Sequence, residues 1–124
     1  MKRLIAAAIL SAIVLSLAII SSFTVKYYYN SLTDTIEVIE EKEQKKISTD
    51  KELTHLKNTW EKAQPMLMFF ANHDSVEEIG ISLNRLIALH SAKDEGAFLA
   101  ETAVFKTLLG YLKDSESLSA ESVF

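Results

Sequence analysis

Histidine and carboxylate side chains gather near residue 75, and they form the first group in the chain with types and spacing suited to chemistry. His73, Asp74, Glu77 and Glu78 lie close together, and His73 and Glu77 have the i,i+4 spacing that lets two side chains share a metal ion. The chain has no HExxH sequence, and acidic residues are also what the positive end of a helix attracts. We therefore expect a capped, solvated helix start here and no metal site.

The chain lacks the sequence patterns that activate a nucleophile or cradle a phosphate group. It contains no cysteine, so thiol nucleophiles, disulfides and zinc–thiolate sites are excluded. Gly80, Gly96 and Gly110 stand too far apart for a phosphate-binding loop, and no serine occurs in a Gly-x-Ser-x-Gly sequence. His55 and His90 are isolated along the chain, with no visible partner for pH sensing. The sequence predicts a protein that is not an enzyme and binds no cofactor.

Arg85 is the one charged residue that we single out as a candidate interaction residue. It is the only arginine after residue 3, among ten lysines, and its planar guanidinium suits a carboxylate gripped from two sides. The carboxylates that could form an ion pair with Arg85 are those of Glu78, Glu101 or a partner protein. The alternative is that the side chain lies along its helix with the guanidinium in water.

The element that must position all these groups begins with an uncharged run at the amino end. Residues 4–25 contain no charged residue, Gly or Pro, and as a helix they would be about 33 Å long, enough to cross the hydrocarbon core of a bilayer. A cleaved signal would have a shorter apolar stretch and a small-x-small site, and a soluble core helix would have one polar face. We expect a transmembrane helix, with those two as the alternatives.

The charges that flank this span predict its orientation. Lys2 and Arg3 precede it and only Lys26 follows closely, which favours an amino terminus in the cytoplasm. We expect residues 1–3 to be cytoplasmic and the rest of this single-pass cell-membrane protein to be extracytoplasmic. Three consecutive tyrosines, residues 27–29, suit the outer interface of the membrane.

A stripe of small residues inside the span is the second candidate interaction surface. Ala8, Ala12 and Ser16 repeat every four residues, a spacing that lets a second transmembrane helix approach closely. Such a stripe also arises by composition alone. Lateral association with a partner or with a second copy of the chain is the function that it would serve.

The part of the chain beyond the span is acidic. It carries all 17 Asp and Glu residues and 11 of the 13 Lys and Arg residues, so its formal net charge is 11 minus 17, or −6. This charge disfavours nucleic acid as a partner. The partners that we expect are the lipid bilayer and either another protein or a second copy of the chain.

Beyond the span, apolar residues recur at helical spacing, and three Gly and one Pro in the whole chain leave few turn signals for β-hairpins. We expect a stalk helix over residues 26–47 that continues the span, a helical bundle over residues 48–116, and a tail over residues 117–124. The positions expected to face the core are Leu32, Ile36, Ile39 and Ile47; Leu53, Leu56, Trp60, Ala63, Leu67 and Phe70; Ile79, Leu83, Leu86, Ile87 and His90; and Phe98, Thr102, Phe105, Leu109 and Leu112.

Breaks in this periodicity predict where the helices begin and end. Thr49 and Glu52 have capping-box spacing, Asp74 or Ser75 would cap the next helix, and Asp94 would cap the last, which we expect to end near Lys113. The fold class is therefore all-α: one transmembrane helix followed by an up-and-down bundle of three long helices plus the stalk.

Pro65 falls inside the second outer helix. It lacks a backbone N–H and crowds the preceding turn, so we expect a kink near Glu61 or a break in the helix.

The segments "WEKAQPMLMFFANHDSVEEIGISLNRL" and "LSAESVF", together with "MKRLI" at the start, resemble a bacterial family catalogued as domain of unknown function 4363. The resemblance extends over the whole chain and includes Trp60, Phe70, His73 and Ile79. It implies an exported, membrane-tethered helical protein of Gram-positive lineages and supplies no catalytic residues. Pro65 departs from the uninterrupted helix of that family.

These observations lead to one expected function and two rivals. We expect a non-enzymatic, membrane-anchored helical domain that binds another protein or itself, through the stripe of small residues in the span or the apolar stripe of the stalk. One rival is a ligand-sensing bundle, with a small molecule bound among helices two to four, that acts laterally on another membrane protein. The other is a metal enzyme that uses Asp74, Glu77 and Glu78.

Overall fold

Four α-helices make up the part of the chain that the computed structural model describes, residues 1–123, with side chains described up to Asp114. The described residues contain no strand, so the predicted all-α class is confirmed. Residue 124, the last of the expected tail, lies outside the described part. The helices are α1 (Lys2–Gln44), α2 (Asp50–Phe70), α3 (His73–Ser91) and α4 (Glu95–Val123).

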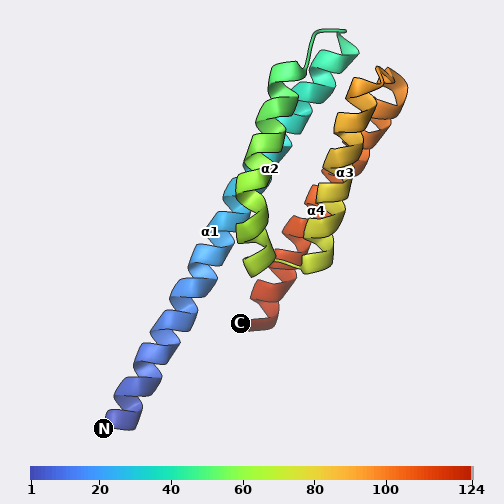
Figure 1. Cartoon of the computed structure of the whole chain (residues 1–124). Helices are drawn as coiled ribbons and strands as arrows, with labels where there is room; N and C mark the ends of the chain where they lie inside the picture. Colours follow the sequence, from blue (N-terminus) through green and yellow to red (C-terminus); the bar gives the residue numbers. More distant parts are fainter. Residues whose placement is uncertain (124) are drawn as a thin grey trace.

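The helices alternate in direction and form a closed square (Figure 1). α1 runs away from the amino terminus, α2 returns beside its second half, α3 runs away again, and α4 returns next to both α3 and α1. Among the described residues, the helices on the diagonals of the square, α1 and α3 or α2 and α4, do not contact each other. The predicted up-and-down bundle is confirmed, and the stalk is its first helix.

The expected span and stalk are one continuous helix of 43 residues, α1. No Gly or Pro interrupts it, and its first half projects from the bundle without a neighbouring helix (Figure 1). This half is long and apolar enough to cross a membrane, and its apolar side chains are exposed. Such a helix is consistent with a single-pass membrane protein, while its orientation stays a prediction.

The core is built from one apolar face of each helix, and the faces predicted from the periodicity are largely the ones buried. Four expected positions differ: Ile47 is 50% exposed, and Phe70, Ile87 and His90 are only partly buried. Val25, which we placed at the end of the span, is 2% exposed and belongs to the bundle core. The core residues are Val25, Leu32, Ile36 and Ile39 in α1; Leu53, Leu56, Trp60, Ala63 and Leu67 in α2; Val76, Ile79, Leu83 and Leu86 in α3; and Phe98, Phe105, Leu109 and Leu112 in α4.

The start of α2 lies where we predicted it, but the predicted capping box does not form. Thr49 is the N-cap residue and makes no side-chain cap hydrogen bond. Its Oγ1 instead donates to Oε1 of Glu43, 3.0 Å away, and Glu52 pairs with Lys42 of α1. A hydrogen bond to a charged carboxylate is stronger than one to a neutral group, so the contacts across the α1–α2 turn replace the local box.

The N-cap residue of α3 is Asn72, so the predicted cap at Asp74 or Ser75 is wrong. Oδ1 of Asn72 accepts hydrogen bonds from the backbone N–H groups of Asp74 at 2.9 Å and Ser75 at 3.3 Å. Asparagine is as good an N-cap residue as aspartate or serine, and the earlier start places Val76 inside the helix and in the core.

The last helix begins as predicted and ends later than predicted. Oδ1 of Asp94 accepts a hydrogen bond from the N–H of Ala97 at 3.2 Å, which confirms the cap. α4 continues to Val123, so the expected end near Lys113 is wrong. The polar sequence after Lys113 weakens the apolar periodicity, but serine and glutamate are both compatible with a helix.

Pro65 does not break α2, which is continuous from Asp50 to Phe70. The proline is exposed, so its ring lies on the solvent side of the bundle. Ala63 and Leu67, on either side of it, are fully buried. The core face of α2 therefore passes Pro65 without interruption.

Candidate functional site

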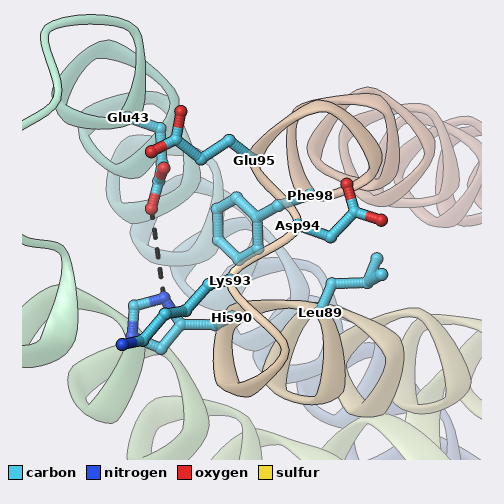
Figure 2. A pocket seen from close by; sticks show the side chains of 7 residues that line it. All are labelled: Glu43, Leu89, His90, Lys93, Asp94, Glu95 and Phe98. Atoms are coloured by element: carbon cyan, nitrogen blue, oxygen red, sulfur yellow. Dashed lines mark ion pairs between the residues drawn. The ribbon is translucent and has the colours of Figure 1, made fainter.

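A polar junction at the end of the bundle remote from the amino terminus brings His90 against two carboxylates. Nε2 of His90 lies 2.5 Å from Oδ1 of Asp50, and Nδ1 lies 3.9 Å from Oε1 of Glu43. Figure 2 shows the imidazole below the carboxylate of Glu43, to which a dashed line joins it. The ring of Phe98 lies nearby, with its centroid 5.9 Å from that of His90. His90 belongs to the α3–α4 hairpin and its two partners to the α1–α2 hairpin, so this junction joins the two halves of the bundle.

The sequence could not reveal these partners of His90. Asp50 is 40 residues away along the chain, and no local spacing relates the two residues. Only the closure of the helices into a square brings the two hairpin turns together. His90, which has no partner nearby in the sequence, therefore makes a contact between helices α3 and α2.

Beside the junction lies a small cavity of about 180 Å³. Ligand pockets for drug-sized molecules usually measure about 300–1,000 Å³, so this cavity would admit only a very small molecule. It lies at the tip, whereas we expected a ligand among helices two to four. Its lining residues are Glu43, Leu89, His90, Lys93, Asp94, Glu95 and Phe98 (Figure 2).

The junction predicts how stability depends on acid. Hydrogen bonds from His90 and Ser48, and attraction to His90, hold the pKa of Asp50 below its usual range. Its folded pKa is therefore lower than its unfolded pKa, which is about 3.9. The stabilisation is present above the unfolded pKa and is lost as the pH falls through the folded pKa.

We expect Asp50→Asn to lower the melting temperature near pH 6 and to have progressively less effect as the pH is lowered from 4 to about 2.5. Thermal unfolding of both proteins in detergent, followed by circular dichroism, measures this difference. In a His90→Gln background the Asp50→Asn effect should be much smaller. An Asp50→Asn effect that is constant over this pH range would contradict the assignment.

The acidic cluster at the start of α3 has the geometry of a potential metal site but no further mark of one. One ligand atom from each of His73, Asp74 and Glu77 can lie within 4.8 Å of the others, and Nδ1 of His73 is 3.4 Å from Oε1 of Glu77. All three side chains are exposed, and Asn72 already caps the helix. The absence of a metal site therefore stays a prediction.

A groove on the outside of the bundle runs between α3 and α4, and it contains Arg85. We call it the α3–α4 groove. Its volume is about 390 Å³, and it is an open surface feature with small side chains along its floor. It is lined by Arg85, Ala88 and Leu89 of α3 and by Ala97, Ala100, Glu101 and Val104 of α4.

Arg85 pairs with Glu101 across this groove, one of the partners that we named. Its Nη1 lies 3.6 Å from Oε1 of Glu101. The arginine side chain is 64% exposed, whereas that of the glutamate is only 10% exposed. Oε1 is buried and accepts no hydrogen bond from the described residues. Arg85 therefore offsets part of the charge of a buried carboxylate and still presents much of its guanidinium to a partner.

The two remaining candidate surfaces have different outcomes. Ala8, Ala12 and Ser16 are exposed on the projecting half of α1, so their role in lateral association stays a prediction. The apolar stripe of the stalk is not available to a partner, because Leu32 and Ile36 are fully buried in the bundle itself. That part of our interpretation is wrong.

Comparisons with known proteins identify a family. No curated protein and no solved structure matches the chain. One family model matches residues 19–123, from the middle of α1 to the end of α4, and its description is "Domain of unknown function (DUF4363)". The match includes the whole bundle, the His90 junction and the α3–α4 groove. The chain belongs to this family, domain of unknown function 4363.

Proposed function

We propose that this protein is a non-enzymatic, membrane-anchored helical bundle on the outer side of the cell membrane that acts by binding another protein through the α3–α4 groove. The observation that carries the proposal is the groove itself. Its lining includes three alanines and Arg85, which pairs with Glu101 and is still 64% exposed. The anchoring is supported by the long apolar exposed half of α1. The orientation is supported by Lys2 and Arg3, which precede that half.

The shape of the groove suits a helix of a partner protein. Ala88, Ala97 and Ala100 line its floor, and small side chains at an interface let two helix backbones approach closely. Val104 at its edge is 42% exposed. A partner helix placed here would bury apolar surface that the described part of this chain leaves open.

Exposed apolar side chains extend the groove along both helices. Ile81 stands four residues before Arg85 and therefore on the same face of α3, and Tyr111 stands seven residues after Val104 on α4. Both are at least half exposed. Tyrosine and arginine are among the residues that contribute most to binding at protein interfaces, so this face combines an apolar surface with strong anchoring groups.

Arg85 gives the groove its chemical preference. It is the only arginine beyond the span, in a region of net charge −6. A partner carboxylate would be repelled by most of this surface and attracted to Arg85, and such local complementarity favours one docking position over others. The partner that fits best is therefore a helix with small or apolar residues and one acidic side chain.

Site-specific photo-crosslinking in native membranes tests this proposal. A benzophenone amino acid replaces Ala88 or Ala100 in the full-length protein, and the control carries it at Asn58 on the exposed side of α2. We expect the same adduct from both groove positions, none from Asn58, and loss of the adduct when Arg85→Glu is added. Circular dichroism checks that the variants keep their helix content.

The adduct pattern separates the alternatives. An adduct with a differently tagged copy of this chain would identify the partner as a second copy. Adducts that form equally at Asn58, or that persist with Arg85→Glu, would overturn the groove as the binding surface. For the ligand-sensing rival, the tip cavity restricts a ligand to a few heavy atoms, and the larger α3–α4 groove is an open surface feature.

A further inference from the structure

The corner where α2 meets α3 carries an apolar cluster, which consists of the exposed Met66 and Phe69 and the partly buried Phe70 and which we call the α2–α3 corner. Phe69 is 80% exposed, the most exposed aromatic side chain among those the structure describes. The ring of Phe70 packs edge-on against it, with centroids 4.9 Å apart, and Met66 is also exposed. An exposed apolar patch of this kind often marks a surface that contacts another protein or a membrane.

The position of this corner relative to α1 follows from helix geometry. α1 and α2 run antiparallel from the turn between Gln44 and Asp50, and both helices rise by the same distance per residue. Phe69 stands 19 residues into α2, so it lies level with about residue 25 of α1. Figure 1 shows the corner at the end of the bundle from which the blue half of α1 projects.

Residue 25 is also where the apolar run of α1 ends. The corner and the outer end of the span are therefore at the same height. Phe23 and Tyr27 on α1 are exposed there as well, so aromatic side chains from two helices share this level. Aromatic rings favour the interface between headgroups and hydrocarbon.

Positive charge lies at the same level as the aromatic side chains. Lys26 follows the span directly, and Nζ of Lys113 lies 4.9 Å from the centre of the Tyr29 ring. Lysine side chains placed at the edge of the hydrocarbon region extend their charged ends toward lipid phosphates. The exposed acids Asp74 and Glu77 at the start of α3 also lie at this corner. The feature of the corner that favours a membrane contact is therefore its exposed aromatic side chains and not a net positive charge.

We propose that the α2–α3 corner is a second membrane contact, with Met66 and Phe69 inserted into the interfacial layer of the lipid bilayer. This inference rests on the proposed anchoring by α1. The bundle is then attached at two points, the span and the corner, and the last turns of α4, which is 29 residues long, lie level with the outer part of the span. Val25 and Leu32 are buried in the bundle core, and the continuous helix between them holds the two points at a fixed distance.

Single-cysteine fluorescence on the full-length protein tests the corner, and the chain has no native cysteine to interfere. The variant Phe69→Cys carries an environment-sensitive nitrobenzoxadiazole dye and is reconstituted into vesicles of phosphatidylcholine and phosphatidylglycerol. Leu10→Cys reports on the span, and Ser48→Cys, at the opposite tip, is the aqueous control. Because Phe69 is exposed, its replacement leaves the core intact.

We expect nitroxide-labelled lipids to quench the dye at residues 10 and 69 at least twofold more than the dye at residue 48, with a blue-shifted emission at residue 69. Quenching at residue 10 with a fully aqueous residue 69 would overturn the corner contact and leave the anchoring intact. No quenching at residue 10 would overturn both. A dye at residue 69 that neither nitroxide lipid nor aqueous iodide reaches would mean that protein covers the corner, which also overturns the membrane contact.

Discussion

Replacing Phe105 with alanine is expected to lower the free energy of unfolding of the bundle by about 3–5 kcal/mol. Phe105 is fully buried in the middle of α4 and belongs to the core cluster shared by all four helices. The substitution removes the transfer free energy of the ring and leaves a cavity that rigid neighbouring helices fill only partly. Phe105 is among the largest fully buried side chains of the bundle, so its truncation should have a large effect.

Urea unfolding of the full-length protein in detergent, followed by circular dichroism, measures this loss. The matched control is Val104→Ala, one residue away and 42% exposed, which we expect to change stability by no more than about 0.5 kcal/mol. Equal effects of the two substitutions would contradict the placement of α4 in the square. A loss below about 1 kcal/mol for Phe105→Ala would do the same.

Replacing Arg85 with methionine is expected to cost about 0.5–1 kcal/mol, because the arginine is mostly exposed and makes no hydrogen bond to the buried oxygen of Glu101. Methionine keeps most of the aliphatic stem and removes the charge. The buried carboxylate of Glu101 then loses the cation at 3.6 Å. The cost is smaller than for a fully buried ion pair, because water reaches the guanidinium and already weakens the attraction.

A double-mutant cycle distinguishes this electrostatic origin from a loss of packing. Glu101→Gln removes the buried charge, so in its presence Arg85→Met should cost much less than it does alone. If the two effects simply add, Glu101 does not depend on Arg85. The same methionine variant should also reduce crosslinking at Ala88, because a partner carboxylate would have lost its attraction to the groove.

The helices could be predicted from the sequence because their apolar residues repeat with one unambiguous period. Leu53, Leu56, Trp60, Ala63 and Leu67 follow alternating steps of three and four, and all of them are buried. The sequence at the helix starts was less informative. Asn72, Asp74 and Ser75 are all good caps, and only the packing of Val76 decides between them.

The candidate sites depended on long-range contacts that periodicity does not encode. The partners of His90 lie on another hairpin. The hydroxyl of Thr49 donates its hydrogen bond to Glu43 of α1 instead of capping α2. The stalk stripe was correctly identified as apolar, yet the pattern could not say that the chain itself would cover it. The exposure of Phe69 did have a sequence signal, since residue 69 falls outside the 63, 67, 70 progression of the core face.

The uninterrupted path of α1 has a mechanical consequence. From Ile13, in the middle of the apolar half, to Gln44 at the tip, the helix is about 45 Å long, with no hinge residue between them. Transmembrane helices adjust to bilayer thickness by tilting, typically by about 20°. With α1 anchored in a bilayer as proposed, a rigid lever of this length would convert such a tilt into a sideways displacement of the tip by roughly 15 Å. A change in tilt would then move the His90 end of the protein parallel to the membrane surface.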